Sequence, residues 1–142
     1  MKTIGIIGGG QLGQMMAISA TYMGHKVITL DPDPNCPASL VAEQIVAKYD
    51  DTAAIAKLAA RADVLTYEFE NVSADALAPY EDKLPQGLDL LRISQNRIFE
   101  KDFLTKAGVK VAPYTVINTL EDLNDLDLSK KHVVKTATGG YD

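Results

Sequence analysis

The feature that most constrains the fold of this chain is a glycine-rich loop that directly follows its first apolar run. Residues 4–7 have the length and composition of a buried strand, and three consecutive glycines follow at 8–10. Gly8, Gly10 and Gly13 fit the spacing G-x-G-x-x-G, in which a strand turns sharply into a helix. Glycines permit this turn, and the free amides of the helix N-terminus favour a phosphate or another anion. The loop therefore predicts a doubly wound α/β domain with a ligand site at its first turn.

Apolar runs of strand length alternate with helix-period segments in the first part of the chain. Such alternation is typical of βαβ units, so we predict a mostly parallel sheet. The predicted strands are residues 4–7, 27–30, 43–47 and 64–67, and the predicted helices begin at Leu12, at Asp51 or Thr52, and at Ser73.

The pattern changes after the third of these helices. Residues 88–108 have one long helical pattern, ended by a glycine, and the stretch that follows is extended. A short capped helix is predicted at 119–126 and a final strand at 132–136. That strand runs into two glycines at the chain end, with nothing after it to cover its edge. We therefore interpret the chain as one domain over residues 1–93 and the truncated beginning of a second over 94–142.

Composition argues against several classes of protein. The chain has 142 residues, 46% of them hydrophobic and 23% charged, which is the balance of a soluble globular protein. Its net charge of −5 and its scattered basic residues argue against nucleic-acid binding. No apolar run reaches the roughly 20 residues that span a membrane. Met1 leads directly into the first strand, which leaves no room for a secretory leader and predicts a cytoplasmic protein.

Neither cysteine nor histidine chemistry is indicated. Cys36 is the single cysteine, so no internal disulfide can form, and it has no nearby histidine or second thiol. We interpret it as a structural residue. His25 and His132 lack acidic or cysteine partners at ligand spacing, so no metal site is predicted.

The glycine loop by itself leaves a nicotinamide-dinucleotide-binding domain of an oxidoreductase as an alternative. Asp31 ends the second predicted strand, about 20 residues after the loop, where an acidic residue holds the ribose of a dinucleotide. Gln11 and Leu12 count against this alternative, because they fill positions that face a bound group.

The end of the fourth predicted strand also counts against a dinucleotide. It carries the sequence EFEN, in which Glu68 and Glu70 would lie on the same side of an extended segment, with Asn71 beside them. The carboxyl end of a parallel strand borders the ligand crevice. A carboxylate there suits an amine or sugar hydroxyls better than a pyrophosphate.

Five ordered motifs resemble N5-carboxyaminoimidazole ribonucleotide synthetases, the ATP-grasp enzymes of microbial purine biosynthesis. They are GIIGGGQLGQM at 5–15, DPDPNCPA at 31–38, TYEFENV at 66–72, SQNRIFEKDFLTKAG at 94–108 and VVKTATGGYD at 133–142. Members of this family have an N-terminal Rossmann-like preATP-grasp domain, a central ATP-grasp domain and a small C-terminal domain, and typically form homodimers. The resemblance implies that residues 1–93 form the α/β preATP-grasp domain and that 94–142 begin the ATP-grasp domain.

The resemblance also implies an ATP-dependent carbon–nitrogen ligase. In the family, ATP phosphorylates bicarbonate to carboxyphosphate, which carboxylates the exocyclic amine of 5-aminoimidazole ribonucleotide. The glycine loop would then serve a sugar phosphate and not NAD. Gln11, Leu12 and Glu68 are the implied substrate-binding residues.

The implied ATP-binding residues lie in the last two motifs. Arg97 and Lys135 match family positions that contact the nucleotide, and a guanidinium can pair with phosphate in a bidentate way. Lys135, within an apolar strand, would need a partner for its charge. Gly140, Tyr141 and Asp142 resemble the start of the loop that closes over the phosphates. The Mg²⁺ ligands of the family would lie beyond the chain, so neither a metal ligand nor a catalytic residue is assigned.

The chain departs from the family pattern in two places. Asn96 stands where the family usually has Asp, and Ala137 and Thr138 stand where arginines are common. We expect the chain alone not to catalyse the reaction, because most of the ATP-binding residues and the carboxylates that bind the metal ions are missing. A non-catalytic nucleotide-sensing or assembly module therefore stays open as a third interpretation.

Overall fold

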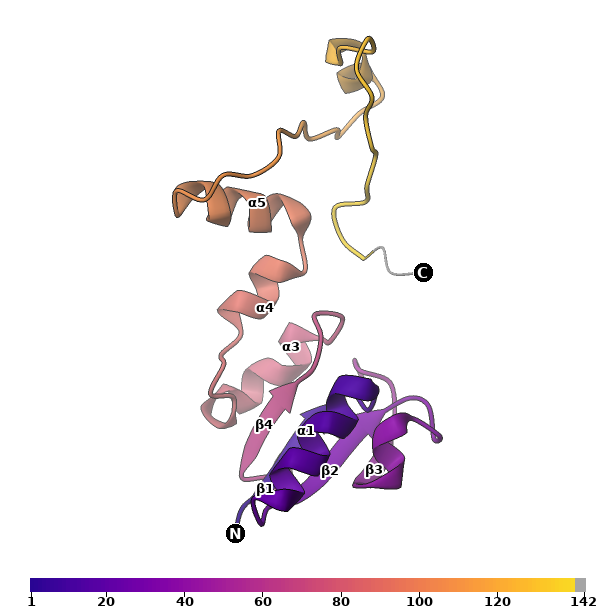
Figure 1. Ribbon diagram of the computed structural model, residues 1–142, viewed down its shortest axis with the longest axis vertical. Helices are drawn as coiled ribbons and strands as arrows, with labels where there is room; N and C mark the ends of the chain where they lie inside the picture. The colour runs from indigo at the N-terminus through magenta and orange to yellow at the C-terminus, as the bar shows by residue number, and fades with distance from the viewer. Residues whose placement is uncertain (140–142) are drawn as a thin grey trace. The chain divides into compact units, whose positions relative to one another are not determined.

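The computed structural model describes residues 1–139 of the chain (Figure 1). It divides into two compact units, Met1–Arg92 and Ile93–Asp142. Three residues that the family resemblance assigns to ATP binding, Gly140, Tyr141 and Asp142, lie outside the described residues. Among residues 1–139, no helix is long and apolar enough to cross a membrane.

The first unit is built on a four-stranded parallel sheet with the order β3-β2-β1-β4. All four strands predicted in the first part of the chain are present, which confirms the α/β fold. Ile7 at the end of β1 pairs with Leu30 in β2 and with Tyr67 in β4. The carboxyl ends of these three strands are therefore level, and the residues that follow them meet at one edge. The strands are β1 (Thr3–Ile7), β2 (Lys26–Asp31), β3 (Glu43–Val46) and β4 (Val64–Tyr67).

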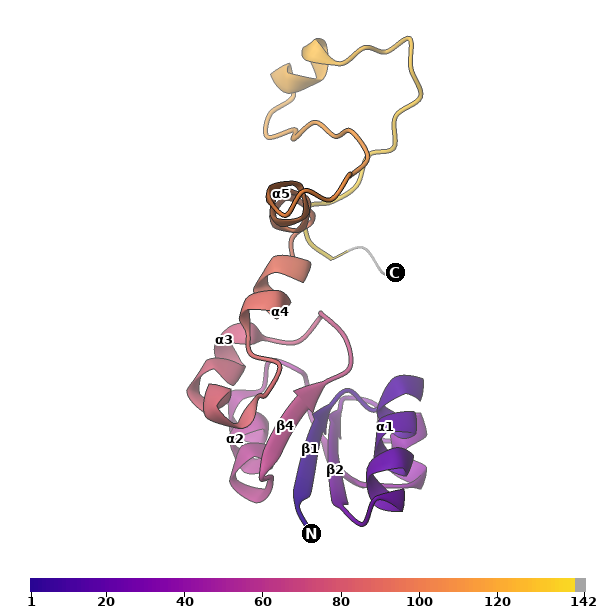
Figure 2. The same ribbon diagram turned by 60° about the vertical axis from the view of Figure 1, so that its left-hand side comes forward.

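Helices cover both faces of this sheet. Figure 2 shows α1 (Gln11–Tyr22) on one face, with α2 (Thr52–Arg61) and α3 (Ala74–Leu77) on the other. The side chains of a strand alternate between faces, so Ile6 packs under α1 while the next residue, Ile7, joins the larger cluster beneath α2 and α3. Two 3₁₀ helices, η1 (Pro37–Leu40) and η2 (Ala78–Lys83), complete this unit.

Side-chain caps begin two of these helices where the sequence predicts them. The Asp51 carboxylate accepts a hydrogen bond from the Ala54 amide at 2.9 Å, and the Ser73 hydroxyl accepts one from the Ala76 amide at 3.1 Å. Each cap satisfies an amide that has no partner within its helix.

The prediction of one long helix over residues 88–108 is wrong, because two separate helices occupy this stretch. They are α4 (Asp89–Ser94) and α5 (Arg97–Lys106). Asn96 between them has an extended backbone, and its side-chain oxygen accepts hydrogen bonds from the amides of Ile98 and Phe99. Asparagine competes with the helix backbone in this way, and it therefore caps a new helix instead of continuing the old one.

The strand predicted over 132–136 is also absent. Residues 131–136 belong to no helix or strand, and Val133 and Val134 are 82% and 84% exposed. Thr138 makes an isolated antiparallel bridge to Asn96. The short helix predicted at 119–126 is the 3₁₀ helix η3 (Glu121–Asp125). A β-branched run becomes a strand only where a neighbouring strand satisfies its amides and carbonyls.

Replacing Asn96 with alanine should destabilise the start of α5 by about 0.5–2 kcal/mol, because the amides of Ile98 and Phe99 lose their acceptor. Asn96→Asp should keep the cap, since a carboxylate accepts the same bonds and is favoured at a helix N-terminus. Amide hydrogen exchange at Ile98 and Phe99 measures the effect. Equal exchange in the alanine variant and the wild type would show that Asn96 does not hold this helix end.

Candidate functional site

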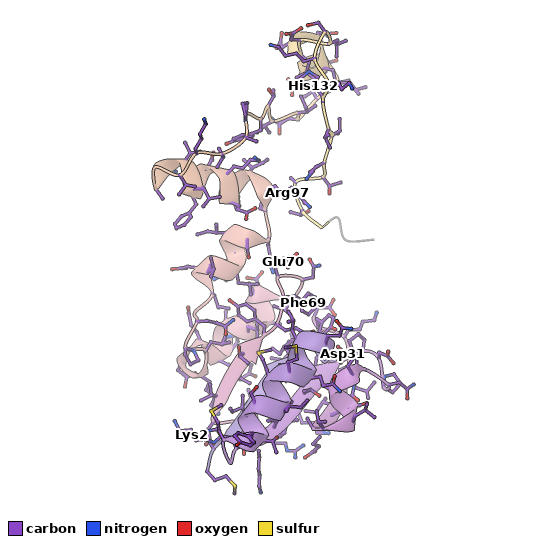
Figure 3. All side chains as sticks on the ribbon, in the orientation of Figure 1. Lys2, Asp31, Phe69, Glu70, Arg97 and His132 are labelled. Carbon is purple, nitrogen blue, oxygen red and sulfur yellow. The ribbon has the colours of Figure 1, made fainter. Side chains whose placement is uncertain are left out.

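The candidate site lies where the carboxyl ends of β1, β2 and β4 meet. The Gly8 amide donates to the Leu30 carbonyl at 2.9 Å, and the Glu68 amide donates to the Ile7 carbonyl at 3.1 Å. These bonds extend the sheet ladder past the strand ends and fix the glycine loop beside the first residue after β4. Figure 3 labels Asp31 and Phe69 near this edge and Lys2 at the opposite one.

The Glu68 carboxylate occupies the glycine loop. One of its oxygens accepts a hydrogen bond from the Gly10 amide at 3.0 Å, and the other accepts one from the Gly13 amide. Gly10 is the N-cap of α1, so this carboxylate sits at the positive end of the helix dipole. The expectation of free amides at this helix N-terminus is therefore wrong, because a carboxylate of the chain already uses them. That the loop serves a sugar phosphate stays a prediction.

The glycines of the loop make room for Glu68. Gly8 has a φ of +104°, and a Cβ there would overlap the Glu68 side chain. A Cβ on Gly10 would lie 2.9 Å from a Glu68 oxygen, and one on Gly13 would lie 3.0 Å from the other and overlap the Gly8 carbonyl. All three positions of the G-x-G-x-x-G spacing thus allow close approach of the same carboxylate.

Asp31 is a buried acceptor of the loop, only 5% exposed. Its Oδ2 accepts hydrogen bonds from the Gly9 amide and the Tyr49 hydroxyl, each at 2.7 Å, and its Oδ1 accepts one from the Asp33 amide at 2.9 Å. In a dinucleotide-binding domain the matching carboxylate holds a ribose. Here its acceptors are used within the chain.

Tyr49 is a member of the site that the sequence did not single out. Its ring packs edge-on against Phe69, with centroids 4.9 Å apart, while its hydroxyl reaches Asp31. Burial raises the pKa of Tyr49 well above its usual value, and its bond to the Asp31 carboxylate raises this pKa further. The available signal was its position two residues after the third predicted strand, at the same edge as Asp31 and Glu68.

Cys36 is buried beneath the loop. A Cβ on Gly9 would overlap its sulfur, so the thiol lies directly against the loop backbone. Burial raises the pKa of the Cys36 thiol, and the carboxylates of Asp31 and Asp33 raise it further. A protonated, buried thiol is a poor nucleophile, in agreement with a structural role.

Gln11 and Leu12 are the first residues of α1 and lie between the two amides that bind Glu68. Both side chains are exposed, Leu12 to 59%. Gln14, one turn on, instead donates its side-chain amide to the Pro37 carbonyl at 2.9 Å. The structure thus brings Gln11, Leu12 and Glu68 together at one edge of the sheet. Glu70 follows the end of β4 within a bend, so strand alternation does not decide its direction.

A hollow of about 400 Å³ opens at the same edge, between the segments that follow β2, β3 and β4. Lys48 and Asp50 line it together with polar groups of Asn71 and Ser73, and Tyr49 joins it to the buried Asp31. The hollow is lined by one basic and one acidic residue, Lys48 and Asp50, so its charge does not favour an anionic ligand over a cationic one.

In the second unit, Arg97 holds a backbone segment. Its guanidinium donates to the carbonyls of Thr136 and Gly139 at 3.1 and 2.7 Å, and its amide donates to the Ala137 carbonyl at 2.8 Å. Lys135 is exposed, so the expectation that it lies within an apolar strand, where its charge would need a partner, is wrong. Within residues 1–139, no three His, Cys, Asp or Glu side chains converge as metal ligands.

The first unit, with its parallel sheet and glycine loop, matches a known family of domains. A sequence model of the ribonucleotide synthetase preATP-grasp domain matches residues 1–87, and the chain belongs to that family. The resemblance to N5-carboxyaminoimidazole ribonucleotide synthetases is confirmed as well. The synthase of Staphylococcus haemolyticus is 50% identical over 99% of this chain and 39% of its own length.

Solved structures of the same enzyme have the same fold. The N5-carboxyaminoimidazole synthetase from Staphylococcus aureus complexed with ADP is 47% identical, with a TM-score of 0.92 over 99% of this chain and 39% of that one. The synthase from Aspergillus clavatus in complex with ADP and 5-aminoimidazole ribonucleotide is 30% identical, with a TM-score of 0.78 over 90% and 36%. The chain therefore spans under two fifths of the length of these relatives. The nicotinamide alternative is not supported.

Replacing Tyr49 with phenylalanine should lower the free energy of unfolding by about 1.5–3 kcal/mol near neutral pH, because a hydrogen bond to the Asp31 carboxylate is lost. The raised pKa of Tyr49 makes this contribution pH-dependent. It is complete below the ordinary tyrosine pKa of 10.0 and is lost as pH rises above it, because the unfolded chain deprotonates first.

Urea denaturation of both proteins at several pH values measures this difference. The advantage of the wild type should be constant up to about pH 9 and shrink beyond about pH 10. Tyr22→Phe is the control, because Tyr22 is 93% exposed and its replacement should leave stability near neutral pH unchanged. A gap between wild type and Tyr49→Phe that widens at high pH would contradict the assignment.

Proposed function

We propose that this chain forms the substrate-side domain, residues 1–93, and the beginning of the nucleotide-binding domain, residues 94–142, of an ATP-dependent carbon–nitrogen ligase. The reaction is the carboxylation of 5-aminoimidazole ribonucleotide by ATP and bicarbonate, which yields N5-carboxyaminoimidazole ribonucleotide for purine biosynthesis. The similarity to synthases of this activity over nearly the whole chain supports the proposal. The observation that carries it is the arrangement at the carboxyl ends of the strands. There the Glu68 carboxylate binds the loop amides, and Gln11 and Leu12 are exposed beside it.

The three substrate-side residues have different roles in this proposal. Glu68 is fixed by two backbone amides, and a carboxylate retains lone pairs for a further donor, such as an amine or a ribose hydroxyl. Gln11 supplies a side-chain amide that can both donate and accept. Leu12 supplies apolar surface for the flat imidazole ring. The phosphate of the ribonucleotide then binds away from the amides of Gly10 and Gly13.

The nucleotide side of the proposal begins at α5. Arg97 bonds the segment 136–139 to the N-terminus of this helix, which positions the backbone directly before Gly140. Lys135 is exposed in that region and free to approach a phosphate as a point charge. Gly140, Tyr141 and Asp142 complete the proposed ATP-binding set. When bound, Mg²⁺ would neutralise charge on the transferred phosphoryl group.

The proposal includes a cytoplasmic homodimer, as in the family that the motifs resemble.

Replacing Gln11 with alanine should weaken binding of 5-aminoimidazole ribonucleotide to this chain about 2- to 10-fold, the worth of one hydrogen bond. Calorimetric titration measures the affinity. Gln14→Ala is the matched control, because this side chain on the same helix is bonded to the Pro37 carbonyl and should not contact the ligand.

Two results of the same titrations would contradict the proposal. Saturable binding of NADH in place of the ribonucleotide would favour the oxidoreductase. Binding of neither ligand would favour the non-catalytic module.

A further inference from the structure

We propose that the Glu68 carboxylate occupies the position at the glycine loop where a phosphate would bind. It thereby excludes phosphate and determines which ligands the loop accepts. In this role Glu68 is a specificity-determining residue for phosphoryl groups as a class. The inference concerns what the loop excludes, and it stands whether or not the chain binds 5-aminoimidazole ribonucleotide.

The first support is the geometry of the carboxylate. Its two oxygens accept one amide each, from Gly10 and from Gly13, as two oxygens of a bound phosphate would. The first turn of α1 contains no acidic residue, so the carboxylate of Glu68, which follows β4, supplies the negative charge at the helix N-terminus. The neighbouring Gly9 amide is bonded to Asp31, a second carboxylate of the chain.

The second support is the space around the loop. In a dinucleotide-binding turn, glycines let the backbone approach a pyrophosphate. Here a Cβ on Gly8, Gly10 or Gly13 would crowd atoms of Glu68. The Glu68 side chain thus lies against all three glycines of the spacing, and its carboxylate occupies the space beside the Gly10 and Gly13 amides.

The third support is the rigid placement of Glu68. Its own amide donates to the Ile7 carbonyl, which fixes its backbone as a continuation of the ladder between β1 and β4. A phosphate that approached these amides would have to displace an anchored carboxylate or bind next to a like charge. A group that is neutral or donates a hydrogen bond meets no such barrier, so the edge selects amines and hydroxyls.

The test is to remove the carboxylate and offer inorganic phosphate and pyrophosphate. In Glu68→Ala, we expect both ions to bind at least about tenfold more tightly than to the wild type. Binding should shift the amide NMR signals of Gly10 and Gly13 saturably and raise the melting temperature. Glu81→Ala is the matched control, since it removes one exposed carboxylate from the same unit and should respond to phosphate as the wild type does.

Each outcome decides the proposal. A folded Glu68→Ala protein that gains no phosphate affinity would overturn it, as would an equal gain in Glu81→Ala. If Glu68→Ala does not fold, the wild type decides, because saturable phosphate-dependent shifts of Gly10 and Gly13 would overturn the proposal and unchanged signals would support it. These readouts use no ribonucleotide, so a failure here is distinct from a failure of the Gln11→Ala experiment.

Discussion

The hydrogen bonds from the Gly10 and Gly13 amides to the Glu68 carboxylate are the interaction on which the candidate site depends. They join the N-terminus of α1, which follows β1, to the residue that follows the neighbouring strand β4. This one contact satisfies helix amides that have no partner within the helix, places a negative charge at the positive end of the helix dipole and fixes the loop. Asp31 does the same for Gly9, so the loop is held by carboxylates from two strand ends.

The fold of the first unit was predictable because its signals are local. Alternating apolar runs and helical periodicity predicted the four parallel strands, and Asp51 and Ser73 marked helix starts by a chemistry that acts over three residues. The glycine spacing likewise predicted the turn. It could not predict what fills the turn, because the carboxylate comes from a residue 55 positions after Gly13. The same limit hid Tyr49, whose partner Asp31 is 18 positions away.

The second unit was less predictable for a related reason. The apolar spacing over 88–108 suits one helix, yet Asn96 satisfies amides that would otherwise continue α4, and the helix ends. The β-branched run at 132–136 suits a strand, but strand formation requires a hydrogen-bonding neighbour that composition does not supply. In both places the outcome depends on competition for backbone hydrogen bonds. Arg97 takes part in the same competition by binding the carbonyls of Thr136 and Gly139.

The thiol of Cys36 gives the protein an internal reporter of loop motion. It is 2% exposed and lies against Gly9, so a thiol reagent can reach it only when the glycine loop or the segment that carries Cys36 moves away. The rate of labelling would therefore measure how often the structure around the glycine loop opens locally. A ligand that tightens the loop should slow labelling, and one that competes for the amides should accelerate it. The single cysteine of the chain makes such a measurement site-specific without any engineering.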